Sequence, residues 1–312
     1  MIPFFRKLWK ANAPLTACTL LMLAAFAGSV IGIFADPRII TGMPAWLKPA
    51  KFAISTAIFS ATIAWLFQYI PGFPRFKRAA GWIFSTVLVL EVGIIDAQAA
   101  RGTTSHFNVG NTLDGVLFQI MGAAIGVLWL TSAAMAYVTF RQPFQNRTWG
   151  WSLRLGTLMF VLGAGAGGFM LAPTSQQRAV LAAHEKVTAI GGHTVGAPDG
   201  EAGIPGVGWS LHHGDLRIPH FFGLHSLQIV PFLGWLVARA RKGTRLLFAA
   251  AASYLAFIGI LTWQALRGQS ILEPDSATLI ALGIWAALTA IAAIWTSKGS
   301  EQYDAGTAVL TV

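Results

Sequence analysis

The chain has 312 residues, of which 55% are hydrophobic and only 11% charged, and its mean hydropathy is +0.61. A soluble domain carries about a quarter charged residues, so this composition predicts a polytopic membrane protein surrounded by lipid. The net charge of +10 then reflects topology and contact with anionic lipid, and it does not indicate a nucleic-acid partner. Because Cys18 is the only cysteine, an internal disulfide is excluded.

Eight apolar runs are near the ~20 residues that a helix needs to cross the hydrocarbon. They are unbroken rather than alternating, which predicts helices and not the strands of a barrel. The runs cover residues 13–34, 51–70, 79–100, 115–138, 152–172, 219–238, 246–266 and 277–297. We therefore expect an all-α bundle of about eight transmembrane helices in a single domain over residues 1–312. A long loop at 174–217 separates the fifth and sixth helices.

The first run has features of a signal peptide, namely the basic residues Arg6, Lys7 and Lys10 and the small residues around Phe26. Its apolar stretch continues to Phe34, which is longer than the 7–15 residues of a signal-peptide core. We therefore expect an uncleaved membrane anchor.

Basic residues cluster before the first run and in every second connection. They are Arg6, Lys7, Lys10, Arg75, Lys77, Arg78, Arg141, Arg147, Arg239, Arg241, Lys242, Arg245 and Lys298. By the positive-inside rule, this alternation predicts a multi-pass protein of the inner (plasma) membrane with both termini in the cytoplasm. Of the acidic residues, only Glu301 and Asp304 then lie on the cytoplasmic side. All seven histidines fall on the extracytoplasmic side: His106, His184, His193, His212, His213, His220 and His225.

The connection before the second run reads GMPAWLKPAKF. Trp46, Lys48 and Lys51 suit an interfacial segment, in which the lysine stems reach toward lipid headgroups. Pro44 and Pro49 are expected to break any long helix here. The alternative is a lid over a functional site.

The third run ends in EVGIIDAQAARGTTSHFN and carries two carboxylates. Glu91 and Gln98 are seven residues apart and share a helix face, whereas Asp96 points about 140° away from Glu91. Carboxylates in an apolar helix are unfavourable unless they are paired, solvated or protonated. They indicate either a structural ion pair with Arg101 or a site for proton transfer or ion coordination. Ser, His and Asp also occur together near His106, but a hydrolase triad requires a geometry that spacing cannot show.

The fifth run contains GAGAGG, which fits the dinucleotide-binding pattern G-x-G-x-x-G through Gly163, Gly165 and Gly168. No strand precedes it, and it lies inside an apolar run. We therefore expect these small residues to allow close helix packing.

The loop 174–217 is glycine-rich and has too few apolar residues for a core of its own. Loops of this length are usually functional or disordered. His193, Asp199, Glu201 and Asp215 are candidate ligands, or they simply solvate the loop.

The sixth run begins RIPHFFGLHSLQ. Arg217 and His220 are three residues apart and can share a face, whereas His225 lies about 140° from His220, so the two histidines are not an i, i+4 metal pair. Gly223 leaves a gap beside His225, and Gln228 lies one turn deeper. Histidines at this depth are candidates for a functional site.

The segments RGTTSHFN and GDLRIPHFFGLHSLQ resemble uncharacterised bacterial polytopic integral membrane proteins of similar size. The eight-span layout with outward histidines is similar to that of haem A synthases, although their glutamate–histidine loop motif is missing here. The alkaline ceramidase-like membrane hydrolases use H-x-x-x-H in a late helix, whereas His220 and His225 are spaced H-x-x-x-x-H.

The leading hypothesis is a redox protein, an oxidoreductase that binds b-type haem near the outer leaflet. His225 would be one axial ligand, with room for the macrocycle at Gly223, and His106 or His220 would be the other. Further cofactor-binding residues are Arg101 and Arg217, which pair with propionates, and Gln98 and Gln228. Glu91 and Asp96 would move protons.

A second hypothesis is a metal-dependent hydrolase or transferase that acts on a small molecule or lipid. Zinc or another divalent metal would be bound by His106, His193, His220 and His225 with Glu91 or Asp215. Its water would be the nucleophile and a carboxylate the base. The third is a proton-coupled transporter that uses Glu91 and Asp96. It requires a path through both leaflets, and apart from Arg154 the sequence shows no comparable polar group continuing inward.

All three hypotheses place the chemistry at one extracytoplasmic site. The residues expected to line this site, its wall residues, are Glu91, Gln98, His106, Arg217, His220, His225 and Gln228. The third and sixth helices would then be neighbours, because polar groups in lipid are driven toward each other or toward water.

Overall fold

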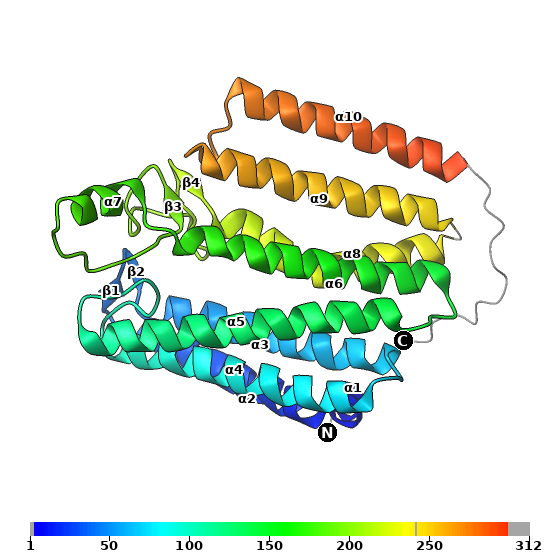
Figure 1. Ribbon diagram of the computed structural model, residues 1–312, viewed down its shortest axis with the longest axis horizontal. Coiled ribbons are helices and arrows are strands. Elements are labelled where there is room, and N and C mark those ends of the chain that lie inside the picture. The colour runs from blue at the N-terminus through cyan, green and yellow to red at the C-terminus, as the bar shows by residue number, and fades with distance from the viewer. Residues whose placement is uncertain (1–2, 241, 299–312) are drawn as a thin grey trace. The chain divides into compact units, whose positions relative to one another are not determined.

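The protein is described by a computed structural model that covers residues 3–240 and 242–298. It is mostly helical (Figure 1). Its helices are α1 (Pro3–Ala11), α2 (Ala13–Ala35), α3 (Leu47–Leu66), α4 (Pro74–Ala100), α5 (Thr112–Arg141), α6 (Arg147–Ala166), α7 (Ser175–Ala182), α8 (Arg217–Arg239), α9 (Thr244–Leu266) and α10 (Ser276–Lys298). Two 3₁₀ turns, η1 (Phe67–Tyr69) and η2 (Gly167–Leu171), follow α3 and α6. The strands are β1 (Ile39–Ile40), β2 (Met43–Pro44), β3 (Thr194–Val195) and β4 (Gly214–Asp215).

Among the described residues, 8 helices are long and apolar enough to cross a membrane. This confirms the expected helical fold with eight candidate spans, and it is compatible with an integral membrane protein in a lipid bilayer. On α10, large apolar side chains such as Leu279, Ile284 and Leu288 are exposed, as lipid-facing residues are.

Glu301 and Asp304 lie outside the described residues, as does Arg241. The cytoplasmic placement of both termini stays a prediction.

The start of α3 differs from the expected run. The helix begins at Leu47, so that Pro49 lies in its first turn. Proline is tolerated there because the first N–H groups of a helix have no intrahelical partner. Pro49 therefore does not break the helix, and Lys48 and Lys51 project from its opening turns.

The segment 174–217 is not a loop throughout, because it begins with α7. Thr174 accepts a hydrogen bond from the backbone N–H of Gln177, and the Gln177 side chain accepts one from the Thr174 N–H. This capping box satisfies two N–H groups at the start of the helix.

The chain forms two compact units. Unit 1 comprises Met1–Ser132 and Gly168–Ser210, and unit 2 comprises Ala133–Gly167 and Leu211–Val312. Most of the long connection between the fifth and sixth spans therefore belongs with the first helices of the chain. The expectation of one domain over 1–312 stays a prediction.

In unit 1, α2 packs along α3, and both contact α4 (Figure 1). Asn12 ties the starts of α2 and α4 together. Its side-chain oxygen accepts the Leu15 N–H and caps α2, while its Nδ2 donates to the carbonyl of Lys77 at 2.9 Å. Phe84, Ile63 and Leu15 are fully buried between the helices and form the core of this unit.

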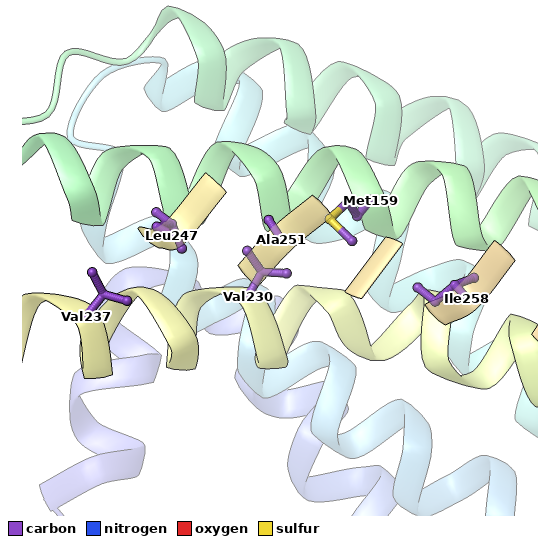
Figure 2. Packing of buried hydrophobic residues seen from close by; sticks show 6 residues of the cluster. All are labelled: Met159, Val230, Val237, Leu247, Ala251 and Ile258. Carbon is purple, nitrogen blue, oxygen red and sulfur yellow. The ribbon is translucent and has the colours of Figure 1, made fainter. Parts of the chain in front are cut away.

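In unit 2, α6 packs on α8, and α9 contacts both α8 and α10. Figure 2 shows the core of this unit as six side chains from α6, α8 and α9. They are Met159, Val230, Val237, Leu247, Ala251 and Ile258.

The glycines of α6 and α8 let these two helices approach closely. A Cβ built on Gly163 would lie only 2.4 Å from the Cα of Gly223. This confirms the packing role for Gly163, whereas a Cβ on Gly168 would meet no atom within 4 Å. The close approach also corrects the expectation for Gly223, which leaves no gap for a macrocycle because α6 fills the space.

Candidate functional site

Lys48 and His106 meet at one end of unit 1. Lys48 is in the first turn of α3, and His106 lies in the connection between α4 and α5. The Nζ of Lys48 is 3.1 Å from Nδ1 of His106, and the Oγ of Ser105 is 3.0 Å from the same nitrogen. An ammonium group can only donate, so Nδ1 accepts and Nε2 carries the ring proton. Burial and the neighbouring charges of Lys48 and His193 hold the pKa of His106 far below its usual value, so the imidazole is neutral.

Glu91 lies on the inner face of α4 and is only 4% exposed. The Lys48 ammonium is close enough for its charge to act on the Glu91 carboxylate. Among the described residues, Oε1 of Glu91 has no hydrogen-bond partner. A buried oxygen of this kind is unfavourable unless it takes up a proton or a water molecule. Glu91, Lys48 and His106 are therefore a connected acid–base group, which we call the Lys48 cluster.

The second carboxylate of α4 does not join this cluster. Asp96 is partly buried, and its Oδ1 has no hydrogen-bond partner among the residues that the structure describes. On the helix it points about 140° away from Glu91. Glu91 and Asp96 therefore do not share a face, and the proton-moving role expected for Asp96 stays a prediction.

His193 lies next to His106 in unit 1. Its Nδ1 is 2.9 Å from Oδ1 of Asp199, which also accepts the backbone N–H of Thr194 at 2.9 Å. Burial acts to raise the pKa of Asp199, but the hydrogen bonds from His193 and Thr194 outweigh it and lower the value to about 2. The Phe107 ring contacts both imidazoles, with centroids 6.2 Å from His106 and 6.4 Å from His193.

Backbone hydrogen bonds fasten the segment after α7 to the connection that carries His106. The N–H of Val109 donates to the carbonyl of Thr188, and the N–H of Ile190 donates to the carbonyl of Phe107, both at 2.9 Å. Farther along the segment, Nζ of Lys51 donates to the carbonyl of Val207 at 2.8 Å. The segment therefore packs on the same end of unit 1 as the Lys48 cluster. Lys48 and Lys51 contact protein groups there, in addition to any contact with headgroups.

A buried carboxylate holds the α4–α5 connection in shape. Asp114, which is 3% exposed, accepts hydrogen bonds from Gln98 at 2.8 Å, Arg101 at 2.7 Å, Asn108 at 3.1 Å and Asn111 at 2.7 Å. Arg101 also donates to the side-chain oxygen of Gln98. The ion pair of Arg101 is therefore with Asp114 and not with a carboxylate of α4, which corrects the structural alternative drawn from the sequence.

The predicted residues of α8 have partners within unit 2. The Arg217 guanidinium is 2.6 Å from the buried carboxylate of Asp215, so both cationic candidates for haem propionates, Arg101 and Arg217, already pair with aspartates. Nδ1 of His220 lies 2.9 Å from the carbonyl oxygen of Gly163. The His225 ring lies against Phe221, with centroids 4.2 Å apart.

Gln228 shares a side-chain hydrogen bond with His225 one turn earlier. Of the seven expected wall residues, Glu91, Gln98 and His106 therefore belong to unit 1, and Arg217, His220, His225 and Gln228 to unit 2. Their convergence on one site stays a prediction. Within unit 1, Glu91 and His106 each interact with Lys48, whereas Gln98 belongs to the Asp114 network.

Lys48 and Asp114 are the residues whose roles the sequence did not reveal. Lys48 resembles a headgroup anchor, because it lies beside a tryptophan at the start of an apolar run. The available signal was topology, since the alternation of basic loops places Lys48 at the same end as His106. Asp114 resembles an ordinary acidic residue of a helix start.

No protein-family model, curated protein or solved structure matches this chain. Over residues 3–240 and 242–298, no group of three or more His, Cys, Asp or Glu side chains is arranged to hold a metal ion. The haem and metal roles expected for His106, His193, His220 and His225 stay predictions.

Proposed function

We propose that the protein is a proton-translocating membrane transporter and that Glu91 is its proton-binding group. The observation that carries this proposal is the buried Glu91 beside Lys48, whose ammonium also reaches Nδ1 of His106. Ionisable groups buried at lipid depth mark ion pathways and proton relays.

Lys48 gives the cluster two arrangements. While Glu91 is ionised, its charge attracts the Lys48 ammonium and offsets part of the desolvation of both groups. When Glu91 takes up a proton this attraction is lost, and Lys48 is held by His106 and its other partners. Protonation thus moves one flexible side chain between two sets of partners, which is what a transporter needs to couple proton binding to a change of conformation.

The contact between Ser105 and His106 does not favour a serine hydrolase. A catalytic base accepts the proton of the serine hydroxyl, and its efficiency depends on a pKa near the working pH. Here Lys48 donates to the same nitrogen, and the pKa of His106 is far below its usual value. The imidazole is therefore a poor base.

Infrared difference spectroscopy over a pH titration tests the proton-binding role. The wild-type protein is expected to show a carboxylic-acid stretching band that appears as the pH falls, and Glu91→Gln is expected to remove it. Glu273→Gln is the matched control, because Glu273 is an exposed carboxylate beside His212. If the band in Glu91→Gln equals that of the wild type, Glu91 is not the proton-binding group.

A second candidate is a b-type haem or a divalent metal such as zinc at His220 in unit 2. A carbonyl oxygen can only accept, so Nδ1 of His220 donates to Gly163 and Nε2 keeps its lone pair. A ring nitrogen held in this way by a backbone carbonyl is typical of metal-ligating histidines. The bound group would supply redox chemistry or an activated water for a hydrolase or transferase.

Absorption spectra and metal analysis of one purified sample test this candidate. We expect a Soret band, or bound zinc, that His220→Ala abolishes and His212→Ala retains, because His212 is exposed and paired with Glu273. A colourless, metal-free preparation from haem-replete cells grown with zinc would count against both cofactors.

A further inference from the structure

We infer that buried hydroxyl groups of α2, α3 and α4 continue from the Lys48 cluster through unit 1 and form a proton path to the Asn12 end of these helices. The inference rests on the proposed function, because it extends the site at Glu91. The hydroxyl row comprises Thr16, Thr19, Thr56, Ser60 and Ser85. All five residues are buried, with exposures between 0% and 7%.

The row is spaced along the three helices. At about 1.5 Å per residue, Ser85 lies about 9 Å from Glu91 along α4. Thr56 lies about 12 Å along α3 from Lys48, and Ser60 about 6 Å farther. Because α2, α3 and α4 pack against one another, these hydroxyls share one interior.

Two unpaired polar atoms show that the interior has unmet hydrogen-bonding capacity. Among the described residues, neither Oε1 of Glu91 nor Oγ of Ser85 has a hydrogen-bond partner, although Glu91 is 4% and Ser85 7% exposed. Buried polar atoms are nearly always paired with protein or with ordered water. These two atoms therefore mark places for water molecules between the hydroxyls.

Ser85 faces the α2 side of the interior. It is four residues after Gly81 and shares its helix face, and a Cβ on Gly81 would lie 2.4 Å from the side chain of Asn12. Across the α2–α3 contact, Oγ of Ser60 donates to Sγ of Cys18 at 3.4 Å. Sulfur is a weak acceptor, so this hydroxyl can turn to a stronger one such as water.

Asn12 ends the row at the opposite end of unit 1. The hydroxyl of Thr16 donates to its backbone carbonyl at 2.9 Å, and its Nδ2 donates to the carbonyl of Lys77 at 2.9 Å. Lys77 in turn donates to the carbonyl of Ile70 at 2.6 Å. This end carries a basic residue and polar carbonyls, where a proton can pass to solvent.

The hydroxyl row supplies polar groups that continue inward from Glu91, which the sequence did not show. Arg154, the inward polar residue noted from the sequence, belongs to unit 2, where it donates to the carbonyl of Gln142. A hydroxyl accepts one hydrogen bond while it donates another, so a proton entering at Glu91 is matched by one leaving at the far end. No bond between heavy atoms changes and no electron is transferred.

Proton flux into liposomes tests the path, with an internal pH dye and an imposed potassium diffusion potential. We expect Thr56→Val and Ser85→Ala each to lower the flux about tenfold, the effect of losing one relay hydrogen bond. Thr56→Ser keeps the hydroxyl and is expected to retain wild-type flux. Thr131→Val is the matched control, because Thr131 lies on α5, outside the three helices of the row, where its hydroxyl donates to the carbonyl of Val127.

The outcomes separate this inference from the proposed function. If Glu91→Gln abolishes flux while Thr56→Val and Ser85→Ala conduct like the wild type, the hydroxyl path is wrong and the proton site stands. If Thr56→Ser loses as much flux as Thr56→Val, packing and not the hydroxyl is responsible, and the path is again wrong. Wild-type flux in Glu91→Gln, or no flux in the wild type, overturns the proposed function.

Discussion

Gly163→Ala is expected to lower the free energy of unfolding by about 3 kcal/mol, the upper end for overpacked sites. The added Cβ would lie 2.4 Å from the Cα of Gly223 and 2.5 Å from its carbonyl carbon. These are backbone atoms of α8, so no side chain can turn away to make room. The two helices must separate, which also lengthens the hydrogen bond between His220 and the Gly163 carbonyl.

Thermal unfolding in detergent, followed by tryptophan fluorescence, measures this effect. Gly259→Ala in α9 and Gly283→Ala in α10 are matched controls, because a Cβ at either position meets no atom within 4 Å. Both controls are expected to be neutral or more stable by up to about 1 kcal/mol, since alanine favours helix more than glycine does. If Gly163→Ala is as stable as these controls, α6 and α8 do not cross at their glycines.

Asp114→Ala is expected to destabilise unit 1 by about 3 kcal/mol. The change removes one of the two acceptors of the buried Gln98 amide, and an unpaired buried donor costs ~1–3 kcal/mol. The Asn108 amide keeps the Thr103 hydroxyl and the Thr104 carbonyl as acceptors, whereas Arg101 and Asn111 each lose a hydrogen bond to Asp114. The connection that carries His106 should then lose its fixed shape.

Hydrogen exchange and urea unfolding are the measurements for this variant. We expect residues 101–111 to exchange faster in Asp114→Ala, whereas Asp114→Asn, which keeps the size and one acceptor oxygen, should show a smaller change. Glu273→Ala is a control for loss of an ion pair, because the pair of Glu273 with His212 is exposed and such pairs add little stability. Equal stability of Asp114→Ala and Glu273→Ala would show that the Asp114 network is not structural.

The eight candidate spans could be read from the sequence because the signal is local. An apolar run of about 20 residues must form a helix in lipid, whatever packs against it, since only a helix satisfies its backbone there. The helix ends were less accurate, as at α3, because the effect of a proline depends on its position in the first turn. The same limit applies to α7, whose capping box is a side-chain contact.

The chemistry-bearing residue types were also evident from the sequence, since histidines and carboxylates stand out in apolar helices. What they contact was decided by tertiary packing. The charge of Lys48 acts on Glu91 because α3 packs on α4, and Arg101 pairs with Asp114 because the α4–α5 connection folds back on itself. Gly223 could equally well leave a gap or admit a helix, and the approach of α6 made it a crossing point. Hydrophobicity therefore determined the helices, whereas the partners of each polar group depended on contacts between residues far apart in the chain.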